Sequence, residues 1–253
     1  MKSKNTTTET TPVIWYFVKF FSDEGHADEF MKGNLHLKRL GYFKKMEQQK
    51  DDGRRDSREA ISHWWQPNDF VMKLTVPEFG EIEIKNEDLA GPVSMSLDFH
   101  ENLHIFCLYS IRTIGFEVID GKIDYAEDEA EILKKQLEVD SRNFEFGRFA
   151  VVTPATQFLD RLKLTLQERA QYFKGRLVEY YDDEIFHGAI KPNEIPFWKQ
   201  KDFSYQNEFR ICVNTKTVGD DPLDISIGNI SDICGKIQSD KINDLLNIQS
   251  IKV

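Results

Sequence analysis

The stretch Phe203-Ser204-Tyr205-Gln206-Asn207-Glu208-Phe209-Arg210-Ile211-Cys212-Val213 decides our expectation for the fold. Side chains of a β-strand point alternately to its two faces. Most odd positions are apolar and are expected to face a core, namely Phe203, Tyr205, Phe209, Ile211 and Val213. The even positions are polar and are expected on the opposite face, namely Ser204, Gln206, Glu208 and Arg210. The pattern therefore predicts one strand that carries Gln206 and Glu208 as neighbours on the same face.

The pair Gln206-x-Glu208 resembles the catalytic strand of ADP-ribosyltransferases. The resemblance implies that Glu208 holds the nicotinamide ribose of NAD, which is the substrate, and that Gln206 contacts the group being modified. By its place on the first expected strand, Lys19 would contact the ribose or the phosphates. That family also braces its catalytic glutamate with a Ser-Thr-Ser strand, of which Ser110 is the matching last residue here.

A wider resemblance covers most of the chain. The order of motifs is similar to a bacterial family of unknown function that often occurs in toxin or phage-defence settings. Its members have an early Lys-Phe strand, an aromatic loop, a Phe-Cys strand and a late aromatic-x-x-Glu-aromatic-Arg strand. The matching segments are Val18-Lys19-Phe20, Leu40-Gly41-Tyr42-Phe43, Ile105 to Ser110 and Tyr205 to Arg210.

The resemblance to transferases implies a defined chemistry. Release of nicotinamide leaves positive charge on the ribose carbon, and a fixed carboxylate stabilises that charge as it develops. A free glutamate has a pKa of about 4.3, so Glu208 is expected to be ionised at neutral pH. Arg210 would hold the carboxylate or a phosphate, and Tyr42 and Tyr109 would stack on nicotinamide. The plain alternative is a strand that shows Gln, Glu and Arg to water.

Composition limits the classes of function. The 253 residues include 40% hydrophobic residues and 19 Phe, enough for a buried core. A net charge of −10 argues against steering of the whole molecule to nucleic acid. Residues 32–58 nevertheless hold nine Lys or Arg against four acids, which is either a solvated loop or a rim for RNA or DNA.

The cysteines and the hydropathy suggest a cytoplasmic location. Cys107, Cys212 and Cys234 are odd in number and widely spaced, so they are interpreted as free thiols rather than disulfides. Their spacing does not suit zinc, and no metal is expected. Since we see no apolar run of about 18 residues and no secretory pattern at the N-terminus, we expect no membrane association.

The order of elements predicts an α+β fold. Val13–Phe21 is apolar on both faces, as in a central strand. A helix is expected from Ser22, its N-cap, to a stop at Gly33. Further strands and helices predict a mixed, mainly antiparallel sheet with helices on its faces, which the resemblance implies is split around a cleft. Residues 1–11 are expected to form a flexible tail and residues 12–253 a single domain.

Three functions follow as hypotheses. The first is an ADP-ribosyltransferase-like toxin or phage-defence effector that modifies a protein or a nucleic acid and has an antitoxin or regulatory partner. The second is a catalytically inactive protein of the same fold that binds a nucleotide or a partner, since Lys19 stands where the family more often has Arg or His. The third is a nuclease-like toxin that uses His63 together with Lys and Arg near the basic loop, although neither a His pair nor a metal-ligand spacing is visible.

Overall fold

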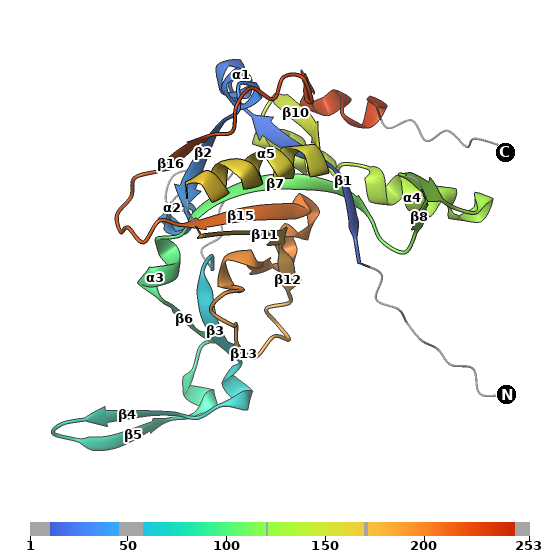
Figure 1. Ribbon diagram of the computed structural model, residues 1–253. Coiled ribbons are helices and arrows are strands. Elements are labelled where there is room, and N and C mark those ends of the chain that lie inside the picture. The colour runs from blue at the N-terminus through green and yellow to red at the C-terminus, as the bar shows by residue number, and fades with distance from the viewer. Residues whose placement is uncertain (1–10, 46–57, 120, 170–171, 246–253) are drawn as a thin grey trace. The chain divides into compact units, whose positions relative to one another are not determined.

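A computed structural model describes residues 11–45, 58–119, 121–169 and 172–245 (Figure 1). All but Thr11 of the expected tail, and residues 46–57 of the basic segment, lie outside these ranges. The fold is α+β with mostly antiparallel strand pairs, as predicted. The pair formed by β12 (Glu179–Tyr181) and β14 (Trp198–Gln200) is parallel. In the described part of the chain, every helix is too short or too polar to span a membrane.

Contacts between Cα atoms divide the chain into two compact units. The first contains residues 1–34, 108–165 and 227–253, and the second contains residues 35–107 and 166–226. Strand β7 (His104–Thr113) contributes its beginning to the second unit and its end to the first. The expected domain from residue 12 to 253 therefore contains two units, which we describe separately.

The first unit is built on a sheet in which β1 lies between β7 and β10, and β10 lies between β1 and β17. Its helices and strands are β1 (Val13–Phe21), α1 (Glu24–Met31), the end of β7, β8 (Glu117–Ile119), β9 (Lys122–Asp124), α4 (Ala130–Leu137), β10 (Phe149–Pro154), most of α5 (Ala155–Glu168) and β17 (Gly235–Gln238). Short 3-10 turns join them, namely η4 (Glu127–Glu129), η5 (Ser141–Phe146), η8 (Ser239–Lys241) and η9 (Asn243–Leu245).

Strand β1 is central, as its apolar sequence predicted. Phe17 and Val18 point to opposite faces and both are fully buried. The ring of Phe17 packs edge-on against Phe158 of α5, with 5.9 Å between ring centroids. Val18 belongs to a second cluster with Ala150 of β10 and Ile111 of β7. Side chains of the first unit therefore bury both faces of β1.

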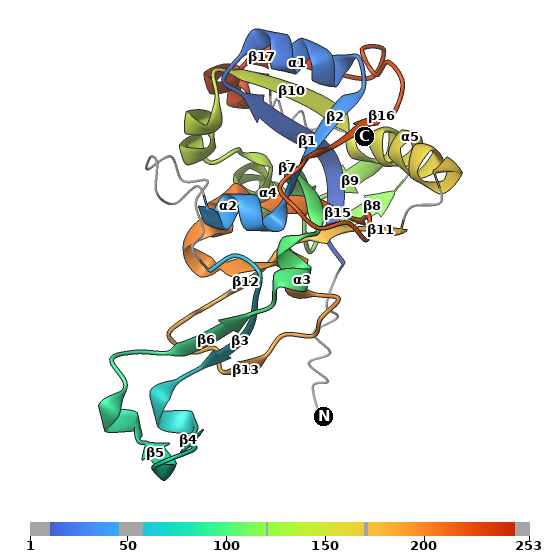
Figure 2. The ribbon, with the colours of Figure 1, turned by 90° about the vertical axis from the view of Figure 1, so that its left-hand side faces the viewer.

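Helix α1 contacts β1 and β10 (Figure 2). Its N-cap is Asp23 rather than the expected Ser22, because the Asp23 carboxylate accepts a hydrogen bond from the backbone N–H of His26 at 3.2 Å. The expected stop at Gly33 is confirmed. Gly33 has φ of +86°, and a Cβ at this position would lie 1.8 Å from the carbonyl oxygen of Gly228. Only glycine allows this close approach.

The second unit contains a sheet in which β15 lies between β11 and β7, while β2 pairs with β7 and β16. Smaller sheets pair β3 with β6 and β13, and β4 with β5. Its helices and strands are β2 (Asn34–Arg39), α2 (Leu40–Lys45), β3 (Ile61–Trp65), β4 (Met72–Val76), β5 (Gly80–Ile84), β6 (Val93–Ser96), α3 (Asp98–Glu101), the beginning of β7, β11 (Tyr172–Leu177), β12, β13 (Gly188–Ala189), β14, β15 (Glu208–Asn214) and β16 (Leu223–Ser226). Its 3-10 turns are η2 (Pro67–Asp69), η3 (Asn86–Asp88), η6 (Ile195–Phe197) and η7 (Lys201–Gln206).

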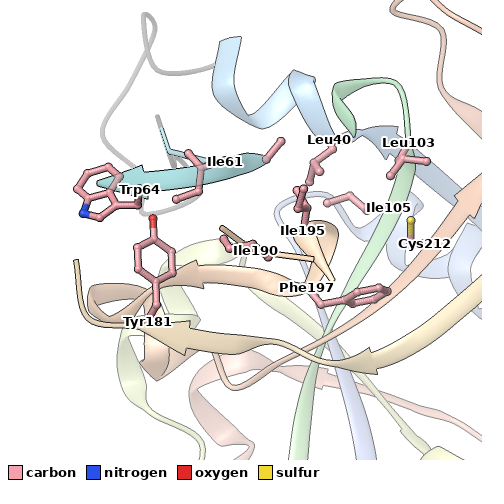
Figure 3. Close-up of a cluster of buried hydrophobic side chains, with 11 residues drawn as sticks. Leu40, Ile61, Trp64, Leu103, Ile105, Tyr181, Ile190, Ile195, Phe197 and Cys212 are labelled. Carbon is pink, nitrogen blue, oxygen red and sulfur yellow. The ribbon is translucent and has the colours of Figure 1, made fainter. Parts of the chain in front are cut away.

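A hydrophobic cluster forms the core of the second unit (Figure 3). Trp64 and Tyr181 face each other at one end of the drawn cluster, with ring centroids 6.4 Å apart. The indole N–H of Trp64 donates to the carbonyl of Asp183 at 3.0 Å, so its polar atom is satisfied although the ring is buried. Of the two adjacent tryptophans, Trp64 is thus a core residue. Trp65 stacks on His63 at 4.8 Å.

The stretch from Phe203 to Val213 is not one strand, which corrects the prediction. Residues up to Gln206 belong to the 3-10 turn η7, and β15 begins at Glu208. Between them Asn207 adopts the left-handed conformation with φ of +42°, and its N–H bonds to the carbonyl of Ser204. Asn tolerates this conformation better than most residues, so the chain turns here.

Three of the four residues expected on the polar face, Gln206, Glu208 and Arg210, are buried, whereas Ser204 is exposed. All residues of β15 from Glu208 to Cys212, and Val213, are buried. The segment from Val93 to Phe99 contributes to two elements. Strand β6 ends at Ser96, and helix α3 follows from Asp98.

Candidate functional site

A buried network of charges in the second unit surrounds Glu208. The guanidinium of Arg210 donates from Nε to one oxygen of Glu208 at 2.7 Å and from Nη2 to the other at 3.3 Å. Its two terminal nitrogens also donate to the two oxygens of Glu59, at 2.5 and 3.1 Å. Arg210 and Glu59 are each 1% exposed. One arginine therefore binds two carboxylates in bidentate fashion, away from water.

Lys199 completes the network from strand β14. Its Nζ lies 3.5 Å from Glu208 Oε2 and donates to the side-chain oxygen of Gln206 at 2.7 Å. The same ammonium lies 4.7 Å from the ring centroid of Phe203, a cation–π distance. Gln206 and Glu208 are thus brought together through Lys199, and not by the pleat of a shared strand.

Backbone groups also help to position the network. Arg210 Nη1 also donates to the carbonyl of Pro196 at 2.8 Å, which connects β15 to the turn η6. Glu59 directly precedes Ala60, which is fully buried and has φ of +62°. A non-glycine residue in this region costs about 1–3 kcal/mol. The unit therefore holds a strained bend next to the carboxylate that Arg210 binds.

The pKa of Glu208 reflects two opposing effects. Burial alone would raise the pKa of its carboxyl, but the charges of Arg210 and Lys199 and the hydrogen bond from Arg210 outweigh burial and lower the pKa to about 2. Burial would likewise lower the pKa of Arg210, yet Glu208 and Glu59 hold it well above its ordinary value. Two negative and two positive groups balance in the network, and Glu208 is ionised at neutral pH.

This arrangement limits what Glu208 can do chemically. Both carboxylate oxygens accept hydrogen bonds from Arg210, and Lys199 lies close to one of them. A carboxylate neutralised in this way stabilises a developing cation less than a carboxylate that faces an open cleft. The network instead joins β15, β14 and the start of β3, and a buried, fully paired network of this kind suits a structural role.

A hollow of about 300 Å³ lies beside this network in the same unit. Its walls come from β12, the following turn and β14, and consist of Glu179, Tyr180, Tyr181, Asp182, Ile185, Phe186 and Trp198. The rings of Tyr181 and Trp198 are stacked at 6.0 Å, and Phe186 lies 5.1 Å from Trp198. The hollow is therefore largely aromatic and suits a flat ring.

Two polar features mark the hollow. The hydroxyl of Tyr180 accepts a hydrogen bond from the backbone N–H of Glu208 at 2.9 Å, which links its wall to the charge network. The indole N–H of Trp198 is buried and donates no hydrogen bond to any described residue. A buried donor without an acceptor costs free energy, so this nitrogen is an unsatisfied group within the wall of the hollow.

Charges of both signs stand at the rim. The carboxylate of Asp182 accepts a hydrogen bond from Lys201 at 2.9 Å, and Glu179 is paired with Arg176. Arg176 and Lys201 are therefore cations close to residues that line the hollow. A ligand that carries an anionic group as well as a ring could reach them.

The other predicted site residues belong to other elements of the chain. Tyr42 is exposed on α2, where its ring contacts Phe43 edge-on and Lys38 lies 4.9 Å from its centroid. The remaining three, Lys19, Tyr109 and Ser110, belong to the first unit. There Tyr109 is buried and its hydroxyl donates to the carbonyl of Glu138 at 3.3 Å, Ser110 is fully buried, and Lys19 is half-buried.

The structure adds two residues that the sequence did not single out. Glu59 lies in a charged stretch and Lys199 follows a tryptophan, so nothing in their local pattern distinguishes them from surface residues. Burial is the signal that identifies them, and burial is a tertiary property. Among the described residues, no group of three or more His, Cys, Asp or Glu side chains is arranged to hold a metal ion.

Comparison of the chain with protein-family models, with curated proteins and with solved structures found no match. The geometry of the second unit therefore carries the functional interpretation.

Proposed function

We propose that this protein binds the flat ring of a nucleotide-like ligand in the aromatic hollow of its second unit, without transferring ADP-ribose. This is the second of the hypotheses raised by the sequence. The observation that carries it is the engagement of Glu208, whose two oxygens are both bound by Arg210 in a buried site. A carboxylate held in this way is not offered to a ribose.

The hollow supports the choice of ligand. Its volume of about 300 Å³ lies at the lower end of the range for small-molecule sites, about 300–1,000 Å³. It would accept one ring rather than a whole dinucleotide. Tyr181 and Trp198 offer aromatic surface to such a ring. Arg176 and Lys201 at the rim would meet phosphates.

A transferase is the second candidate, and one observation favours it. The backbone N–H of Glu208 donates a hydrogen bond to the hydroxyl of Tyr180, and Tyr180 lines the hollow. Glu208 is therefore next to the wall of the hollow. With NAD as substrate, this protein would be a toxin or phage-defence effector with a macromolecular target and a neutralising partner. The split sheet around a cleft and the cytoplasmic location belong to this candidate as proposals.

Calorimetry with NAD, nicotinamide and AMP, together with chromatographic detection of released nicotinamide, separates the two candidates. The proposal expects heat of binding for at least one of these compounds and no nicotinamide after long incubation with NAD. Sustained release of nicotinamide would favour the transferase. If none of the three compounds binds, the hollow is not a nucleotide site.

A pair of variants localises the binding. Trp198→Phe replaces the indole in the wall by a smaller ring and so reduces the aromatic surface that a ligand contacts, which should weaken binding about tenfold. Trp65→Phe is the matched control, since Trp65 does not line the hollow and stacks on His63. Equal affinities of the two variants would place the ligand elsewhere.

A further inference from the structure

We propose that the base bound in the aromatic hollow carries a positive charge, as in a nucleotide whose purine is methylated on a ring nitrogen. This ligand class rests on the proposed function, because it concerns the same hollow. Two features of the wall support a cationic base, namely three aromatic rings in mutual contact and two acidic residues beside them.

The three rings come from Tyr181, Phe186 and Trp198. The centroids of Tyr181 and Trp198 lie 6.0 Å apart, those of Tyr181 and Phe186 lie 5.5 Å apart, and those of Phe186 and Trp198 lie 5.1 Å apart. The face of an aromatic ring is electron-rich and attracts a cation that lies within about 6 Å of the ring centroid. A neutral base gains only stacking from this wall, whereas a cationic base gains the cation–π attraction as well.

The charged residues of the wall are acids. Among the described residues that line the hollow, Glu179 and Asp182 are acidic and none is Lys, Arg or His. The hydrogen bond from Lys201 lowers the pKa of the Asp182 carboxyl, so Asp182 is ionised at neutral pH. A positive base in the hollow is attracted to these carboxylates, and a negative group in the same place is repelled.

The cations that pair with these acids stand at the rim. The side chain of Lys201 is 65% exposed, and the side chain of Glu179, which pairs with Arg176, is 48% exposed. Ion pairs at such exposed positions are weak, because water screens both charges. The phosphate of a nucleotide would attract Lys201 and leave Asp182 to face the base. A ligand with a positive base and a negative phosphate therefore complements both the wall and the rim.

Calorimetry with the full chain at about pH 6, where the methylated base keeps its charge, compares three nucleotides. The base of 7-methylguanosine monophosphate is positive, that of guanosine monophosphate is neutral, and that of N2-methylguanosine monophosphate has the added methyl group without the charge. The 7-methyl nucleotide should bind about tenfold or more tighter than the other two. Equal affinities of the two methylated nucleotides would overturn the inference, since the methyl group rather than the charge would then be recognised.

Failure of this inference differs from failure of the proposed function. If AMP, nicotinamide or guanosine monophosphate binds and the 7-methyl nucleotide binds no tighter, the hollow accepts bases without reading their charge. The inference then falls and the proposed function stands. If no compound of either series binds, both fall.

Variants that keep size and remove charge locate the effect. Asp182→Asn retains a side-chain oxygen for the backbone N–H of Glu184, which donates to Asp182 at 3.1 Å. This variant should reduce the preference for the 7-methyl nucleotide about threefold or more, and the double variant with Glu179→Gln should nearly remove it. Glu184→Gln is the matched control, because Glu184 is an exposed acid of the same turn that does not line the hollow.

The preference for the 7-methyl nucleotide should be unchanged in Glu184→Gln. An equal loss in Asp182→Asn and Glu184→Gln would overturn the inference, because the overall charge of the turn would then explain the preference. An undiminished preference in the double variant would overturn it as well.

Discussion

Arg210 binds Glu59 across 151 residues of sequence, through two hydrogen bonds of 2.5 and 3.1 Å that are hidden from solvent. The same guanidinium holds both oxygens of Glu208. Arg210, which the sequence predicts to hold the carboxylate or a phosphate, is therefore the centre of a buried network. The effects that we expect from substitutions at Arg210 and Glu208 follow from this network.

Removal of Arg210 should be strongly destabilising. Arg210→Met would leave Glu59 and Glu208 buried without their shared guanidinium, and breaking a buried ion pair costs about 3–5 kcal/mol. Urea unfolding should show this loss. Replacing Glu59, Glu208, Arg210 and Lys199 together by Leu or Met should recover most of the stability, because no charge is then left unpaired. If no such combination recovers the lost stability, the fold requires the geometry of the network itself.

Glu208→Gln should affect stability more than ligand binding. The substitution removes a charge that balances Arg210 and Lys199, so we expect a loss of about 1–3 kcal/mol, the range for a buried group whose partner is weakened. Glu208→Gln should therefore lower the stability of the fold. Ring binding should persist, because the Glu208 side chain does not line the hollow. Calorimetry below the unfolding range of the variant checks this, and loss of binding in a folded variant would contradict it.

Stability should fall on acidification in two steps. Burial lowers the pKa of His100 and of His104, so the folded protein takes up these protons at lower pH than the unfolded chain, whose histidines take them up below about pH 6.5. Stability therefore decreases as pH falls through this range. The pKa of Glu208 is lowered to about 2, so its contribution is complete above about pH 4.5 and is lost as pH falls toward 2.

Urea unfolding between pH 4 and pH 8 measures the first step. His100→Asn should flatten the curve between about pH 5 and pH 7, and His26→Asn, a change at an exposed position of α1, should not. A curve that stays steep in His100→Asn would show that other groups cause the first step.

Gly33→Ala should lower the stability of the protein by more than the strain of the left-handed φ alone. The new Cβ would lie 1.8 Å from the carbonyl oxygen of Gly228, and the left-handed φ adds about 1–2 kcal/mol. Gly115→Ala is the matched control, because Gly115 has the same φ of +86° but nothing lies within 4 Å of its added Cβ. Thermal melting should show a clearly larger loss for Gly33→Ala, and equal losses would mean that the contact with Gly228 relaxes freely.

The sequence by itself determined the α+β class, the central strand β1 and the stop of α1 at Gly33. These features depend on local chemistry, since an apolar run favours a strand covered on both faces and glycine accepts a positive φ.

Only the tertiary structure decided how Gln206 and Glu208 are arranged. Its spacing matched a strand, yet Asn207 turns the chain, and the two side chains meet through Lys199 instead. Glu59 reached Arg210 from a distant segment that no local pattern connects to β15. Periodicity reports which residues share a face, but it does not report what covers that face, and burial of a charge requires partners that only the folded chain brings together.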